Sequence, residues 1–147
     1  MPDLATHLLT SFLPPASRQR RLFLLGGVIW PDLLGRSLTL LFPGNYTLYW
    51  ISTLLHTPLL LLLSTYLLSL ITRRNKVEFF FSWLGGVGLH LAADALQRHY
   101  RPAYFWLFPF SFRSAEIPLF WPEESVFFIP LLLLFLLLLN YYRKKRK

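Results

Sequence analysis

The sequence predicts an all-α protein, a polytopic membrane helical bundle with three long spans and a short N-terminal helical hairpin. The chain is 54% hydrophobic and only 15% charged, whereas soluble domains are roughly 25% charged. It contains long uncharged segments rich in leucine, and runs of basic residues follow those segments directly. So few charges cannot cover a soluble globule, and we expect residues 1–147 to form a single integral-membrane domain.

The composition and the charge distribution exclude several other classes. The apolar content is too high for intrinsic disorder, and the absence of cysteine excludes a disulfide-stapled scaffold and cysteine-ligated metals. The net charge of +8 suits either a nucleic-acid binder or a membrane protein with basic flanks. Eight of the fifteen basic residues lie in the runs Arg73–Lys76 and Arg143–Lys147, each after an uncharged segment. We therefore expect membrane lipid, and no nucleic acid, as a partner; protein partners stay open.

The first long span is expected over Tyr46–Thr72. No residue between Ser37 and Thr72 is formally charged, and the stretch contains five consecutive leucines at 59–63. About 20 residues of helix cross the hydrocarbon core of a bilayer. This segment is therefore long enough to span.

Two further spans are expected later in the chain. Ser125–Tyr142 is uncharged, dominated by leucine, and ends in polar and aromatic residues that are typical of the membrane interface. Val77–Ala95 is apolar apart from Glu78, His90 and Asp94.

The N-terminal apolar runs are too short to cross a bilayer. Leu4–Leu13 is followed by Pro14-Pro15, and Leu22–Trp30 is followed by Pro31-Asp32. Proline ends or kinks helices. We expect these runs to form a re-entrant hairpin or two tilted helices that pack against the spans.

Counting basic residues orients the spans. With the basic tail 143–147 in the cytoplasm, eleven basic residues fall on the cytoplasmic side of the membrane and four fall on the outer side. This imbalance follows the positive-inside rule.

His90 and Asp94 lie four residues apart in the third predicted span. On a helix this spacing puts both side chains on one face. An imidazole and a carboxylate so placed suit a divalent metal, or they satisfy each other through a hydrogen bond. The pair alone leaves both readings open.

Three other residues have imidazole or carboxylate side chains that could bind a metal. Asp32 after Pro31 reads as a turn or helix cap, His56 as an interfacial histidine, and His7 as a packed polar residue. The predicted topology places all five in the outer half of the membrane or just beyond it. Three histidines and two aspartates in one place suit zinc, with manganese or iron as alternatives, and they carry the metal prediction: His7, Asp32, His56, His90 and Asp94.

Arg98 and Arg101 follow this set in the predicted outer loop. Arginine binds phosphate through parallel hydrogen bonds, so both are candidates for binding a substrate phosphate. The competing interpretation is an interfacial belt that contacts lipid headgroups.

The order of these residues resembles the YdjM-like family of membrane-bound, predicted metal-dependent hydrolases. The resemblance runs from His7 to Ser111 and rests on these motifs: His7, Pro31-Asp32, His56-Thr57, His90-Leu91-Ala92-Ala93-Asp94 and Phe108-Pro109-Phe110-Ser111. It implies a multi-span protein of the bacterial inner membrane whose His and Asp set binds metal, by distant similarity to zinc-dependent phospholipase C.

The chain departs from that pattern at two places. Many members carry an additional histidine within the stretch that corresponds to Ile51–Thr57, and a second acidic residue where Leu34 stands. The resemblance therefore implies a one-metal site with His56, His90, Asp94 and either His7 or Asp32.

Two functions follow as expectations. The first is a membrane-embedded metal-dependent hydrolase of a lipid or phosphoester at the outer leaflet, whose catalytic residues the sequence does not identify. The alternative is a small non-catalytic membrane protein in which the His and Asp cluster is a structural polar network.

Overall fold

A computed structural model of the chain describes residues 3–73, 75–98, 104–117 and 119–145. In these residues the predicted all-α fold is confirmed: they contain no β-strand. Seven α-helices and one short 3₁₀ helix follow in order: α1 Asp3–Thr10, α2 Arg18–Leu34, α3 Arg36–Leu41, α4 Tyr46–Leu55, α5 Pro58–Ile71, α6 Lys76–Ala95, η1 Pro122–Glu124 and α7 Ser125–Lys145.

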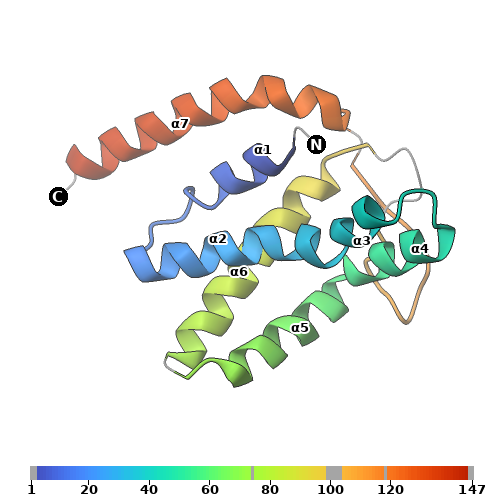
Figure 1. Ribbon diagram of the computed structural model, residues 1–147. Helices are drawn as coiled ribbons and strands as arrows, with labels where there is room; N and C mark the ends of the chain where they lie inside the picture. The colour runs from blue at the N-terminus through green and yellow to red at the C-terminus, as the bar shows by residue number, and fades with distance from the viewer. Residues whose placement is uncertain (1–2, 74, 99–103, 118, 146–147) are drawn as a thin grey trace.

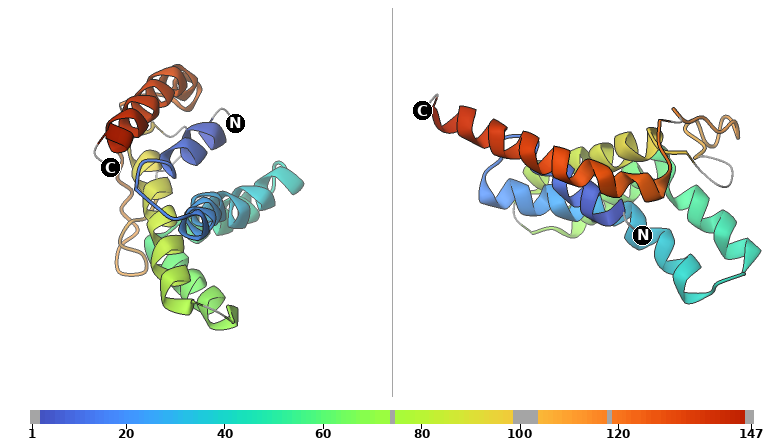
Figure 2. Two further views of the ribbon diagram at one scale, coloured as in Figure 1. Left: turned by 90° about the vertical axis from the view of Figure 1, so that its left-hand side faces the viewer. Right: turned by 90° about the horizontal axis from the view of Figure 1, so that it is seen from above.

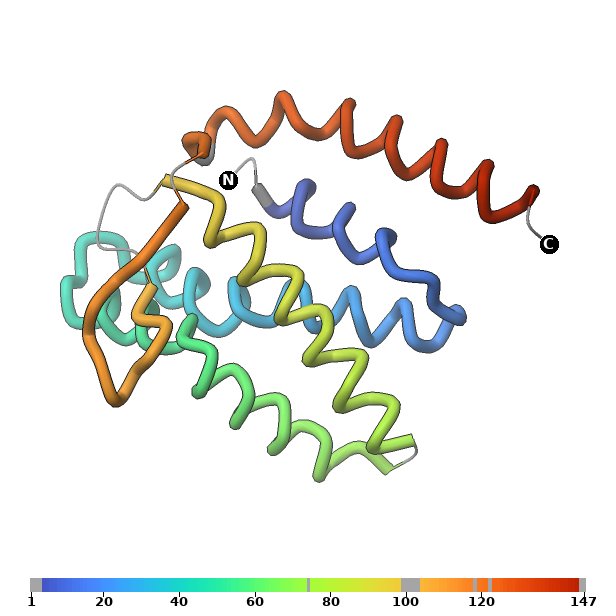
Figure 3. Tube along the Cα trace, turned by 180° about the vertical axis from the view of Figure 1, so that it is seen from behind, coloured from blue at the N-terminus to red at the C-terminus, as the bar shows by residue number. Residues whose placement is uncertain are grey.

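The helices form an open bundle around α6 (Figure 1). Helix α2 crosses α6 over the largest helix–helix contact, and α5 packs against another part of α6. Helix α1 contacts α2 and α6 and separates them from α7, which lies along one side of the molecule (Figure 2). Helices α3 and α4 stand at one end, where the loop that follows residue 103 lies beside α4 (Figure 3).

The crossing of α2 and α6 is close because glycines meet there. A Cβ atom on Gly27 would lie 2.0 Å from the backbone oxygen of Trp83, and one on Gly86 would lie 2.2 Å from the backbone oxygen of Leu24. Backbone atoms cannot give way without moving a whole helix, so neither position has room for a side chain. The two glycines therefore set the register that brings the C-terminal halves of α2 and α6 together.

The apolar core is small and sits between α5 and α6, with α2 against it. Leu61, Val87 and Leu91 are buried there. Trp30 packs edge-on against Trp83, with ring centroids 5.7 Å apart. Much of the remaining leucine and phenylalanine surface on α5 and α7 is exposed, so these two helices contribute little to an internal core.

The span expected over Tyr46–Thr72 is not one continuous helix. The segment forms two helices, α4 and α5, which meet at an angle of 72°. Proline has no backbone N–H and forces the preceding residue out of the helical region. Thr57 accordingly has an extended backbone, with ψ of 144°, and Pro58 opens α5 at the position where proline is favoured.

The structure does not support three long spans. Among the described residues, α7 alone is long and apolar enough to cross a bilayer as one helix, and the bent pair α4–α5 passes the same test only when its two halves are joined. The predicted helix at Val77–Ala95 does form, as α6. Glu78, His90 and Asp94 make it too polar to count as a span.

The predicted end of the second N-terminal run at Pro31 is also wrong. Helix α2 continues through Pro31 to Leu34, so Asp32 lies in a helical turn. Proline inside a helix removes its own N–H bond and crowds the preceding turn, yet the helix continues here, and the backbone N–H of Gly35 donates to the carbonyl of Pro31, at 2.9 Å.

Candidate metal centre

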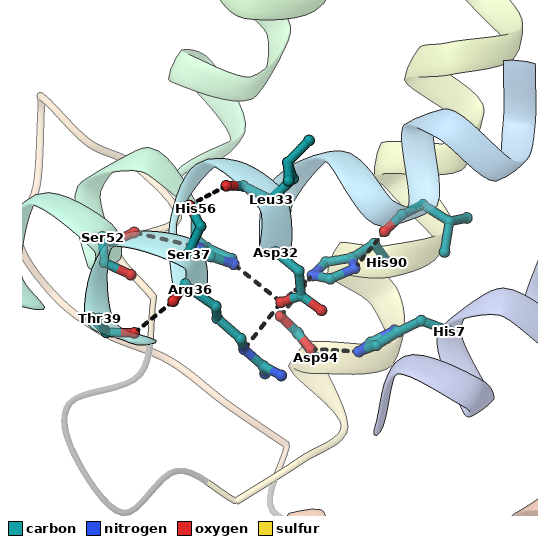
Figure 4. A network of polar contacts seen from close by, with 11 residues as sticks. His7, Asp32, Leu33, Arg36, Ser37, Thr39, Ser52, His56, His90 and Asp94 are labelled. Carbon is teal, nitrogen blue, oxygen red and sulfur yellow. Dashed lines mark hydrogen bonds and ion pairs between the residues drawn. The ribbon is translucent and has the colours of Figure 1, made fainter. Parts of the chain in front are cut away.

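Four helices bring the five predicted ligands to one buried place (Figure 4). Their ligand atoms form two overlapping groups, His7 with Asp32 and His90, and His56 with His90 and Asp94. Within each group these atoms lie within 4.8 Å of one another. His7, His56, His90 and Asp94 are at most 1% exposed. The convergence that the sequence predicted is therefore present.

Asp94 lies between two histidines. His90 Nε2 is 3.2 Å from Asp94 Oδ2, as the spacing of four residues on α6 predicts. His7 Nε2 reaches the other oxygen, Oδ1, at 3.1 Å from α1. The His7 ring stacks on His90 with centroids 4.2 Å apart, so α1 closes this side of the cluster.

Asp32 occupies the opposite side of the cluster. Its Oδ1 lies 3.6 Å from His56 Nε2 and 3.9 Å from His90 Nε2. Arg36, one turn further along the chain, approaches the same oxygen through Nε at 2.9 Å. The side chains of Arg36 and Asp32 are 25% and 12% exposed, so this is the more accessible edge of the site.

The hydrogen bonds of the Nδ1 atoms determine the tautomers of His90 and His56. His90 Nδ1 lies 2.8 Å from the carbonyl of Val28, and His56 Nδ1 lies 3.0 Å from the carbonyl of Ser52. A carbonyl only accepts, so each Nδ1 must carry the proton, and in a neutral ring Nε2 then presents a lone pair. Both Nε2 atoms are buried without a hydrogen-bond partner among the described residues.

Those lone pairs face carboxylate oxygens, an arrangement that is unfavourable unless a cation lies between them or the rings are protonated. Histidines that bind metal characteristically donate their other N–H to a carbonyl or carboxylate in this way. The donor set of imidazole nitrogens and carboxylate oxygens suits zinc. The observed hydrogen bonds therefore fit a metal site.

The carboxylates stay ionised. Burial favours the neutral acid and acts to raise the pKa of Asp94, but the contacts from His7 and His90 outweigh it and hold that pKa well below its usual range. Burial likewise acts to raise the pKa of Asp32, and His56 together with the charge of Arg36 brings it below the usual value. Two carboxylates facing one guanidinium leave an excess negative charge for a bound cation to neutralise.

His56 reaches the site because of two neighbours in the sequence. The break before Pro58 puts His56 at the end of α4, and Gly35 leaves space for its ring. A Cβ atom on Gly35 would lie 2.2 Å from His56 Cε1 and 2.3 Å from Nδ1. The histidine was predicted inside a continuous span, whereas the structure places it at the bend between two helices.

We expect Gly35→Ala to lower the metal affinity of the site by about tenfold or more, within the range seen when the support of a ligand is lost. The new methyl group would push the His56 ring away from Asp32. Titration with zinc in competition with a chelator measures the change. Gly88→Ala is the matched control, since a Cβ there meets nothing within 4 Å; equal affinities in the two variants would contradict the expectation.

Tyr104 belongs to the site, and sequence reasoning missed it. Its ring stacks on His56 with centroids 5.0 Å apart and planes 5° from parallel. Burial, together with the nearby charge of Asp94, raises the pKa of Tyr104 well above its usual value. The hydroxyl therefore stays protonated. The aromatic run Tyr104–Phe110 is typical of an interfacial belt, and no spacing in the sequence distinguishes Tyr104 from its neighbours.

Arg36 was missed as well, in favour of Arg98 and Arg101. Arg36 contacts the cluster directly, and its spacing of four residues from Asp32 on a helical segment was the available signal. Arg98 instead lies over the ring of Trp121, with the guanidinium carbon 5.4 Å from the ring centre. Arg101 lies outside the described residues.

A comparison with protein families gives one result that bears on this site. The family model described as zinc dependent phospholipase C matches residues 3–116. That range includes all five predicted ligands together with Arg36 and Tyr104, and it ends before α7 begins. No curated protein and no solved structure matches the chain.

Proposed function

Because the chain belongs to the zinc-dependent phospholipase C family, a family of metal-dependent hydrolases, we propose that it hydrolyses a phosphodiester bond of a phospholipid. In this reaction water attacks phosphorus and the bond to the glycerol oxygen breaks. Diacylglycerol leaves with a proton, and the headgroup keeps the phosphate. The observation that carries the proposal is the convergence of His56, His90 and Asp94, whose ligand atoms lie within 4.8 Å of one another.

Zinc is the divalent cofactor of this family, and the donor set fits it. We assign His56, His90 and Asp94 as ligands, with His7 or Asp32 completing a four-coordinate set. When bound, zinc polarises a phosphoryl oxygen and lowers the pKa of a coordinated water. The carbonyls of Ser52 and Val28 hold the His56 and His90 rings with Nε2 toward the centre.

Arg36 supplies the positive charge at the accessible edge. Its side chain is 25% exposed, while the four deepest residues of the cluster are almost fully buried. A guanidinium there suits an anionic phosphoryl oxygen. Asp32 holds Arg36 through Nε, so the carboxylate orients the arginine as well as facing the metal. Arg98 and Arg101 stay second candidates for the same phosphate.

We place the protein at a membrane through α7. This helix has 21 residues, and only 11% of its most apolar window is buried inside the molecule. The N-terminal turn of α2, the α5–α6 connection and the C-terminal end of α7 all carry basic residues, and they lie at the same end of the molecule (Figure 1). This distribution favours a basic cytoplasmic end, including residues 143–147. A bacterial inner membrane and the narrower YdjM-like relationship belong to the same proposal.

A structural polar network is the second candidate function. It is favoured by the ion pair of Arg36 with Asp32 and by the direct His90 to Asp94 contact. In that case His90 is an imidazolium that donates to Asp94, and the cluster holds four helices together without catalysis.

Metal analysis and a lipid assay together test the proposal. We expect the detergent-purified chain to contain about one zinc per molecule by elemental mass spectrometry, and to release diacylglycerol from phosphatidylcholine or phosphatidylglycerol. Removal of zinc by a chelator should abolish the release, and added zinc should restore it. A folded protein that takes up no zinc and releases no diacylglycerol would favour the polar network.

Arg36→Gln should raise KM for the phospholipid by at least about tenfold, the range for loss of a hydrogen bond to a charged group. Zinc content should stay near that of the wild type. Arg113→Gln, which removes an exposed positive charge, is the control for net charge. An unchanged KM in Arg36→Gln would remove this residue from substrate binding and favour Arg98 or Arg101.

A further inference from the structure

A pocket lies away from the candidate metal centre, between the C-terminal end of α7 and the connection from α1 to α2. Its volume is about 930 Å³. The residues that matter for its chemistry are Arg21, Leu137, Asn140, Tyr141, Arg143 and Lys144. Arg21 and Asp32 lie eleven positions apart on α2, about 16 Å along a helix, so this pocket is not part of the metal centre.

The pocket concentrates positive charge. Arg21, Arg143 and Lys144 line it, its lining contains no acidic side chain, and no ion pair joins any of the three to a described residue. Three cations without a carboxylate partner repel one another, and a bound anion relieves that repulsion.

The two arginines are held in place by backbone carbonyls. Arg21 Nη1 donates to the carbonyl of Ser11 at 2.9 Å, and Arg143 Nη2 donates to the carbonyl of Leu13 at 2.6 Å. The Arg21 guanidinium also lies over the Phe12 ring, 4.8 Å from its centre. Carbonyls orient a guanidinium without neutralising its charge, so both arginines are preorganised for an anion.

The part of the pocket lining that α7 contributes next to its basic end is apolar, and α7 is the candidate membrane helix. Leu137 lines the pocket, and Leu134 and Leu138 beside it on α7 are exposed. Asn140 and Tyr141 mark the change from this apolar surface to the basic end. Helix α7 is about 32 Å long, which matches the thickness of a bilayer core. A ligand that fits has a phosphate for the cations and an acyl chain for α7.

We propose that this pocket binds the phosphate of an anionic phospholipid, such as phosphatidylglycerol, at the basic end of α7. The bound lipid would fasten α7 to the α1–α2 connection. It is distinct from the substrate at the metal centre, because the two sites lie at different ends of α2. A basic pocket between helices beside a membrane span is a recognised kind of headgroup site.

The test measures the thermal unfolding midpoint of the zinc-loaded full chain in neutral detergent, with three probes. These are dioleoyl phosphatidylglycerol, dioleoyl phosphatidylcholine and sodium phosphate. The test variant is Lys144→Glu, because Lys144 lines the pocket and is exposed. Lys145→Glu is its matched control, since Lys145 is adjacent, exposed and outside the pocket. Arg21→Gln tests the pocket from α2. Zinc content and diacylglycerol release are measured in the same samples.

We expect phosphatidylglycerol to raise the midpoint of the wild type and of Lys145→Glu by several degrees. The rise should fall at least twofold in Lys144→Glu and in Arg21→Gln, while zinc content and hydrolysis stay normal in Lys144→Glu. Equal stabilisation by phosphatidylcholine, or an equal loss in Lys144→Glu and Lys145→Glu, would overturn the proposal. An equal effect of sodium phosphate that depends on Lys144 would identify free phosphate as the ligand and overturn the lipid assignment. A wild-type protein without zinc or without hydrolytic activity would count against the metal centre. The shift of the unfolding midpoint by phosphatidylglycerol would still test the lipid pocket.

Discussion

Asp94→Asn should remove zinc from the protein and lower phospholipid hydrolysis by at least about a hundredfold, the upper end of the cost of losing an outer-shell partner of a metal. The substitution keeps the size of the side chain and removes its charge. Asp94 is fully buried and faces His7 and His90 at 3.1 and 3.2 Å. Asparagine would leave those nitrogens without a carboxylate, and zinc without an anionic ligand. Elemental mass spectrometry and diacylglycerol release measure the two effects.

Glu78→Gln is the matched control for Asp94→Asn. It makes the same chemical change on the same helix, at a residue that pairs with the 60% exposed Arg20. Surface ion pairs contribute little to stability, so zinc content and hydrolysis should stay at the wild-type level. If Asp94→Asn keeps its zinc and its activity, Asp94 is not a ligand. If neither the wild type nor Asp94→Asn contains zinc, and Asp94→Asn only unfolds more easily, the cluster is a structural polar network.

Gly86→Ala should destabilise the fold by about 3 kcal/mol, the upper end of the usual cost of overpacking. The added Cβ would lie 2.2 Å from the carbonyl oxygen of Leu24 and 2.8 Å from the backbone nitrogen of Val28. Because both atoms belong to the backbone of α2, the two helices must separate. His90 lies one turn after Gly86 and is bonded to the Val28 carbonyl, so the metal centre should loosen too.

Gly88→Ala is the control on the same helix, because nothing lies within 4 Å of a Cβ there. Alanine is the better helix former, so this variant should be as stable as the wild type or up to about 1 kcal/mol more stable. Thermal unfolding in detergent compares the two; for a chain of this size about 3 kcal/mol corresponds to a fall of about 6–12 °C. Equal midpoints for Gly86→Ala and Gly88→Ala would refute the close crossing of α2 and α6.

Local sequence accounts for part of the secondary structure. Uncharged leucine-rich composition identified α7, and the apolar composition of Val77–Ala95 identified α6. Pro58 contained the signal for the break between α4 and α5, but the length of the uncharged stretch outweighed it. Pro31 gave the opposite error: we expected the helix to end there, but α2 continues through Pro31 to Leu34.

Local spacing predicted one part of the candidate site, and the rest depended on the predicted topology. The spacing of four residues on one helix was enough to predict that His90 and Asp94 lie side by side. The prediction that His7, Asp32 and His56 join this pair rested on residue chemistry together with an assumed topology. The five residues do meet, although the assumed set of three spans is not supported.

The sequence by itself determined the all-α fold, the one clearly apolar helix and the residue types that suit a metal, because these depend on composition and on helical spacing. Tertiary structure decided what surrounds those residues. Gly35 makes room for His56, Tyr104 stacks on the same ring, and Arg36 holds Asp32. The same is true of the basic pocket, where Arg21 and Lys144 lie far apart along the chain. Contacts between distant segments leave no periodic signal in one sequence, so only the packing of the helices reveals them.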